Sequence, residues 1–197
     1  MLDTLQELFE HELRDMYDAE HKLVRALRTM AKKVPDKALS ENLEDHRSIT
    51  QRQVKRLEEV FRAVDKKPRR EPCRGINGLI DEFTKFVNQE ESSEEILNTF
   101  AVGASLKVEQ YEIVAYQTLL RLAGQLELPE ALALLEENLS EEIEAARQLE
   151  SLADQLVGPL TSLSNVSREP VILPEVTEQI VLGEESDATT VPPDRPL

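Results

Sequence analysis

Apolar residues recur along most of the chain with the 3.6-residue period of an α-helix. The pattern is sustained in four long stretches, over about residues 2–34, 36–64, 94–127 and 129–157. Pro35 ends the first stretch, and Pro129 suits the first turn of the last one. Each stretch has a wide apolar stripe on one face, which predicts amphipathic helices packed around a shared core.

The lengths of the connections predict how these helices are arranged. The links at Pro35 and near Leu128 are very short, so the helices that they join must form antiparallel hairpins. Residues 65–93 form a long connection with an apolar segment at about residues 79–87, which predicts a shorter crossover helix. We therefore expect an all-α fold, a ferritin-like four-helix bundle of two antiparallel hairpins with a crossover helix between its second and third helices. A simple up-down-up-down bundle would need a short middle link, and a coiled coil would need sustained heptads.

The composition changes after residue 157. Residues 158–197 hold six of the ten prolines, seven acidic residues and only two basic ones. We predict a bundle domain over residues 1–157 and a Pro-rich, acidic, non-helical tail over 158–197, disordered in part. The segment 171–182 within this tail is apolar enough to dock on the bundle or on a protein partner as an extended peptide.

Net charge and cysteine content restrict the classes of partner and the compartment. The formal net charge of −16 argues against nucleic-acid binding, which needs a basic face. The first 14 residues contain four acidic residues and no apolar run, so we expect neither a signal peptide nor a membrane anchor. The single cysteine, Cys73, fits a reducing compartment, and we expect a cytoplasmic protein.

Polar residues at core positions are the most informative feature of the helical pattern. Each long helix has one ionisable residue in its apolar stripe, and these residues are Glu20, His46, Glu112 and Glu142. Glu109 lies one turn before Glu112, at the edge of the stripe. Counted from the hairpin turns, the four stripe residues lie within one helical turn of the same depth, near the middle of the bundle.

Buried carboxylates at one depth need compensation, because each unpaired charge costs several kcal/mol to bury. A divalent cation bound by carboxylates and an imidazole supplies that compensation, and iron, manganese and zinc all suit such ligands. Two alternatives to a metal stay open. The carboxyl groups can share protons, and Lys107 at the stripe edge can pair with Glu112. We interpret Tyr111 and Tyr116 as packing residues.

The chain resembles the YciE/YciF-type ferritin-like stress proteins of bacteria over roughly residues 3–157. The resemblance rests on residues 12–20 (ELRDMYDAE), 54–61 (VKRLEEVF), Cys73 with 78–82 (GLIDE), and 107–116 (KVEQYEIVAY). It implies a homodimeric bundle with a two-metal site and a role in stress resistance. It also places Glu20, His46, Glu109, Glu112 and Glu142 at the family's inward acidic and histidine positions.

Four positions depart from the pattern that the resemblance implies: Ser48 and Ile49 replace two acids, Gln110 replaces a histidine, and Ala145 stands where a second ligand would follow Glu142. We therefore carry two hypotheses. In the first hypothesis, the protein binds metal ions, most readily iron, and binds two of them if the ligands suffice. It then oxidises Fe(II) and protects the cell against oxidants. In the second, it is a metal-free helical scaffold or an adaptor that docks through its tail.

Overall fold

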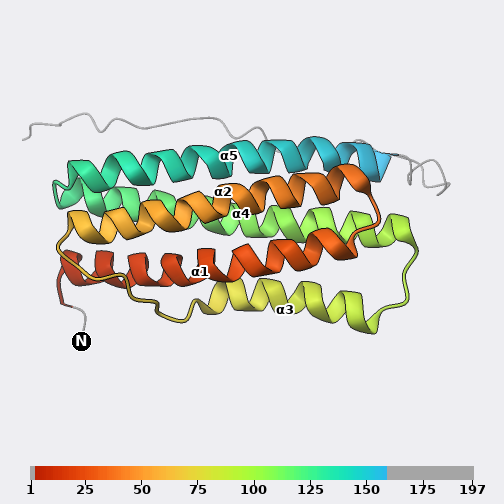
Figure 1. Ribbon diagram of the computed structural model, residues 1–197, viewed down its shortest axis with the longest axis horizontal. Coiled ribbons are helices and arrows are strands. Elements are labelled where there is room, and N and C mark those ends of the chain that lie inside the picture. Colours follow the sequence, from red (N-terminus) through yellow and green to blue (C-terminus); the bar gives the residue numbers. More distant parts are fainter. Residues whose placement is uncertain (1–2, 159–197) are drawn as a thin grey trace, which may run out of the picture. The chain divides into compact units, whose positions relative to one another are not determined.

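The structure, a computed structural model, describes residues 3–158, and this part of the chain forms five α-helices (Figure 1). They are α1 (Leu5–Lys33), α2 (Lys37–Ala63), α3 (Arg74–Gln89), α4 (Glu94–Gln125) and α5 (Pro129–Val157). The expected all-α fold is confirmed, and the helices begin and end within a few residues of their predicted limits. The predicted tail, with its segment 171–182, lies outside the described residues apart from Gly158. Among residues 3–158, no helix is both long and apolar enough to span a membrane.

The four long helices form two antiparallel hairpins, α1–α2 and α4–α5, as the short links predicted (Figure 1). The crossover leads the chain from the end of α2 back along the bundle to the opposite end, where α4 begins. Within it, α3 packs against α1 and α4 and makes the fifth helix (Figure 1). This path makes α2 antiparallel to α5 and brings the middles of all four long helices together.

Side chains just before the helices fix where they start. Thr4 and Glu7 form a capping box at α1, and the carboxylate of Asp36 accepts from the backbone N–H of Leu39 in the first turn of α2. Ser93 caps α4 in the same way, and α5 begins at Pro129. These local signals explain why the hairpin links are as short as the sequence predicted.

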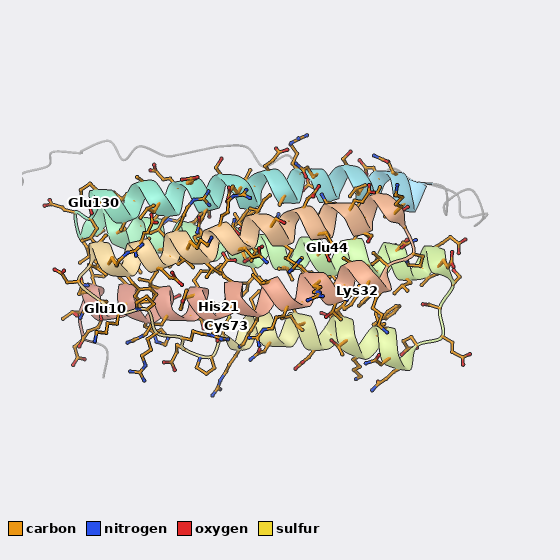
Figure 2. The ribbon with its side chains drawn as sticks, viewed as in Figure 1. Glu10, His21, Lys32, Glu44, Cys73 and Glu130 are labelled. Atoms are coloured by element: carbon orange, nitrogen blue, oxygen red, sulfur yellow. The ribbon has the colours of Figure 1, made fainter. Side chains whose placement is uncertain are left out.

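Asp18 on α1 anchors the beginning of the crossover. Its buried carboxylate accepts from the backbone N–H of Cys73 at 2.9 Å and from Arg70 at 2.8 Å, and it pairs with Lys22. Burial opposes ionisation, but the bonds from Lys22, Cys73 and Arg70 together keep the pKa of Asp18 below its ordinary value. Figure 2 shows Cys73 next to α1, close to His21. The crossover is thereby tied to the bundle one turn before α3 begins.

Two glycines of α3 provide a matched pair for testing this docking. A Cβ atom on Gly75 would clash with the ring of Tyr111, whose hydroxyl contacts Cys73 Sγ at 3.2 Å. A Cβ atom on Gly78 would meet nothing within 4 Å. We expect Gly75→Ala to lower the free energy of unfolding by about 1–3 kcal/mol through overpacking, and Gly78→Ala to raise it by up to about 1 kcal/mol through helix propensity. Urea titration of both variants measures the difference, and equal effects would show that α3 does not dock as described.

Candidate metal centre

All five residues singled out by the helical pattern are buried in the middle of the bundle. Glu20 of α1 and Glu142 of α5 have no exposed surface, Glu109 and Glu112 of α4 are 1% exposed, and His46 of α2 is 5% exposed. Glu109, expected at the edge of the stripe, is thus as deeply buried as Glu112. Helical periodicity therefore located these side chains correctly, while their role as metal ligands stays a prediction.

Four of the five residues form one compact group, which we call the core cluster: His46, Glu109, Glu112 and Glu142. Each offers one ligand atom, and these atoms all lie within 4.8 Å of one another. His46 Nε2 lies 3.4 Å from Glu109 Oε1 and 3.6 Å from Glu142 Oε2. Ligand atoms around a single ion lie at most about 4.2 Å apart, twice a bond length of about 2.1 Å. The distances between the ligand atoms of the core cluster are therefore close to those around a single cation.

Glu20 lies beside the core cluster and has its own hydrogen-bonding partners. The Tyr116 hydroxyl donates to Glu20 Oε1 and accepts from Asn138 Nδ2 at 2.9 Å. Arg56 donates to Asn138 Oδ1 at 3.0 Å, which extends this chain of hydrogen bonds towards the surface. Tyr116, interpreted from the sequence as a packing residue, is thus also a hydrogen-bond donor to a buried carboxylate.

Many polar atoms of this region have no hydrogen-bond partner within the described residues. They are Glu20 Oε2, Glu109 Oε2, both carboxylate oxygens of Glu112, Glu142 Oε2, His46 Nδ1 and Gln53 Oε1. Buried polar groups are nearly always satisfied, and an unpaired carboxylate oxygen is among the most costly exceptions. Oxygens of this kind, together with a neutral imidazole, are good ligands for iron, manganese or zinc. The donor set therefore fits one divalent cation.

Burial and mutual repulsion change the protonation of the centre. Burial, followed by the charge of Glu142, raises the pKa values of Glu20, Glu109 and Glu112 well above the ordinary range. Burial also raises the pKa of Glu142 to about 7 and lowers that of His46 to about 4. His46 is thus neutral at pH 7, the form that can bind a metal, whereas the carboxyl groups hold protons that a metal must displace.

These shifts predict how the stability of the metal-free protein depends on pH. A carboxyl group whose folded pKa is raised, as for Glu142 from 4.5 to about 7, contributes stability that is lost as pH rises through that folded pKa. The lowered pKa of His46 acts in the opposite direction, but only between about 4 and 6.5. From pH 6.5 to 8.5 only the buried carboxyl groups change the free energy of unfolding. It falls by about 1.4 kcal/mol per pH unit for each proton that the folded state retains and the unfolded state has lost. We expect the Tm in excess chelator to fall over this window, and a constant or rising Tm would contradict buried carboxyl groups.

Two buried polar residues at the centre, Gln53 and Asn138, were missed from the sequence. The amide of Gln53 donates to Glu142 Oε1, Asn138 contacts Tyr116, and the Tyr116 hydroxyl contacts Glu20. Gln53 follows His46 by seven residues and Asn138 precedes Glu142 by four, so the rule that found the acids could have found both. The alternative in which Lys107 pairs with Glu112 is wrong, because Lys107 is exposed and its Nζ lies 2.7 Å from Glu82.

The four positions that depart from the family pattern are of two kinds, exposed positions and positions that line a groove. Ser48 and Gln110 are exposed, so acidic or histidine side chains there would not reach the core cluster. Ile49 and Ala145 line a groove next to His46. The core cluster therefore loses no metal ligand through the replacements at Ser48 and Gln110.

Comparisons with known proteins agree with this architecture. A family model described as "Domain of unknown function (DUF892)" matches residues 4–159. Protein YciF of Escherichia coli (strain K12) is 35% identical over 153 residues, which cover 77% of this chain and 92% of that protein. The crystal structure of the E. coli stress protein YciF matches with a TM-score of 0.76 over 79% of this chain and 98% of that chain, at 34% identity. YcfI from Rhodopseudomonas palustris matches with a TM-score of 0.74 over 76% of this chain and 94% of that chain, also at 34% identity. The chain therefore belongs to the DUF892 family, that of the YciF-type ferritin-like bacterial stress proteins.

Proposed function

We propose that the protein binds one divalent metal ion per chain, iron in preference, at His46, Glu109, Glu112 and Glu142. The observation that carries the proposal is a set of five buried carboxylate oxygens, on four glutamates near the middle of the bundle, that have no hydrogen-bond partner among residues 3–158. Cation binding compensates such oxygens directly. The proposed role within the stress-protein family is protection against oxidants.

The residues of the centre divide into ligands and supporting groups. His46 supplies a neutral nitrogen, and Glu109, Glu112 and Glu142 supply oxygens. Gln53 and Tyr116 each hold one oxygen of a glutamate, Glu142 and Glu20 respectively, which orients the carboxylates. Bound iron would supply one-electron transfer to oxygen or peroxide, and apolar side chains of the core pack around the centre.

Glu20 has a separate place in this proposal. It lies outside the core cluster, yet one of its oxygens has no hydrogen-bond partner in the part of the chain that the structure describes, and its charge acts on Glu109 and Glu112. A full two-iron site uses about six protein ligands. The core cluster accounts for one ion, and Glu20 would be the first ligand of a second.

Metal analysis tests the proposal. Protein purified without chelator is loaded with Fe(II) under anaerobic conditions, desalted, and measured by mass spectrometry for metal per chain. We expect about one ion in the wild type, none in Glu112→Gln, and the wild-type value in Glu136→Gln, a control at an exposed site of α5. The same low content in all three proteins would remove the proposal.

A metal-free scaffold is the second candidate, and one observation favours it. Glu109 and Glu142 both lie close to His46 Nε2, and burial together with the charge of Glu142 raises the pKa of Glu109, which is the behaviour of two carboxyl groups that share a proton. In that case the centre stays protonated and gains nothing from metal. The homodimer implied by the family resemblance and the cytoplasmic location are further proposals, which light scattering and fractionation would check.

A further inference from the structure

A groove between α2 and α5 leads from the surface to the core cluster. These helices run antiparallel side by side (Figure 1). The groove has a volume of about 270 Å³, and its wall includes His46, Ile49 and Ala145 together with the acidic residues Asp45, Glu141 and Glu144. Since a water molecule occupies about 30 Å³ of liquid, a cation with six waters, roughly 180 Å³, fits inside it.

Polar contacts between the helices flank the groove. Near one end, Asn42 Nδ2 donates to Gln148 Oε1 at 3.2 Å. Near the other, Glu141 is held by Arg56 at 2.7 Å and by Arg52 at 3.4 Å. Between these contacts Ala145, a buried residue with only a methyl side chain, leaves the space that forms the groove.

His46 lies between the groove and the core cluster. It forms part of the groove wall, while its Nε2 lies 3.6 Å from Glu142 Oε2 in the cluster. Its other ring nitrogen, Nδ1, is buried and has no hydrogen-bond partner in the described residues. Metal-binding histidines usually have that second nitrogen fixed by a partner. In the described residues nothing competes for this nitrogen, so a ligand that arrives through the groove can contact His46.

The charges of the groove favour cations at its mouth. Glu141 and Glu144 are paired with arginines, Arg52 and Arg56 for the first and Arg147 for the second. Asp45 is exposed and has no ion-pair partner within the part of the chain that the structure describes. An unpaired carboxylate at a groove mouth raises the local concentration of cations.

We infer that this groove is the entry route for the metal, with Asp45 as the outer contact and His46 as the first ligand of the core cluster that the ion reaches. The inference rests on the proposed function. It also gives Ala145 a role, since the small residue that replaces an expected ligand keeps the route open. A larger side chain at position 145 would slow uptake without removing any ligand of the cluster.

The rate of uptake, measured separately from affinity, tests the route. Metal-free protein is mixed with Co(II) in a stopped-flow instrument, and absorbance reports binding. We expect Ala145→Leu to take up Co(II) about tenfold more slowly with the final occupancy unchanged, and Ala145→Ser to behave like the wild type. Asp45→Lys should slow uptake at least about threefold at low salt. The matched control is Asp81→Lys on α3, a helix that packs on α1 and α4 and is remote from the groove.

The outcomes separate this inference from the proposed function. If wild type and all variants fill at the same rate and to the same level, the site stands and the groove is not its entrance. If wild type takes up no Co(II) and no Fe(II), the proposed function and the entry route both fall. Should Ala145→Leu lose its helical circular dichroism, the comparison of Asp45→Lys with Asp81→Lys decides alone, because both positions are exposed.

Discussion

Replacing Glu142 by glutamine is expected to abolish metal binding and at the same time to stabilise the metal-free protein. Glu142 contributes an unpartnered oxygen to the core cluster and lies 3.6 Å from His46 Nε2. We expect the affinity for Fe(II) or Co(II) to fall at least about 100-fold. The neutral amide removes a charge that burial makes unfavourable, since the pKa of Glu142 is raised to about 7. The gain in free energy of unfolding at pH 8 is roughly 3 kcal/mol.

The gain should shrink to less than about 1 kcal/mol at pH 5, where the carboxyl group of the folded wild type is itself protonated. Glutamine can still accept the hydrogen bond that Gln53 donates to Oε1 of Glu142, so the packing is retained. Titration calorimetry measures the affinity, and chemical denaturation in chelator at both pH values measures stability. Glu136→Gln, an exposed change in the same helix, should alter neither. A variant that binds metal normally, or that is less stable at pH 8, would contradict the account of Glu142.

Saturating metal is expected to raise the Tm of the wild type by about 5–10 °C. A ligand that binds only the folded state at 100 times its dissociation constant stabilises it by about 2.7 kcal/mol. A chain of this size gains roughly 2–4 °C for each kcal/mol. The physical source is the compensation of the buried oxygens of Glu109, Glu112 and Glu142. Thermal melts with Fe(II) or Mn(II), compared with melts in chelator at pH 7.5, measure the shift.

The same melts distinguish the two candidate functions. A metal-free scaffold holds its buried carboxyl groups by protons, so its Tm would not respond to metal. Glu142→Gln supplies the control, since its Tm should be insensitive to metal although it folds. An equal rise in wild type and variant would point to binding at surface acids, and no rise in either would favour the scaffold.

The bundle and its two hairpins could be predicted because each signal is local. Pro35 and Pro129 mark short links, the apolar stripes follow the 3.6-residue period, and the length of the 65–93 connection implies a crossover. The same periodicity found all five buried ionisable residues, because the depth of a side chain along a straight helix follows from counting residues from the turn. Only α3, with two buried residues, was predicted from a shorter apolar segment than the helix has.

Contacts across helices could not be read from periodicity. Lys107 lies at the stripe edge, and only the position of α3 shows that it reaches Glu82 instead of Glu112. Glu20 has the same periodicity as Glu142, yet it accepts from the Tyr116 hydroxyl and is not among the four residues of the core cluster. Ala145 is informative only when the groove beside it is known. These properties depend on how helices rotate and pack, which a single helix does not determine.

The most direct test of the central claim is an anomalous difference map from crystals of the protein loaded with Fe(II), collected at the iron absorption edge. The account predicts one strong peak in the middle of the bundle, within bonding distance of His46 Nε2 and of carboxylate oxygens from Glu109, Glu112 and Glu142. A map with peaks only at surface acids, or with none at all in iron-loaded crystals, would contradict it.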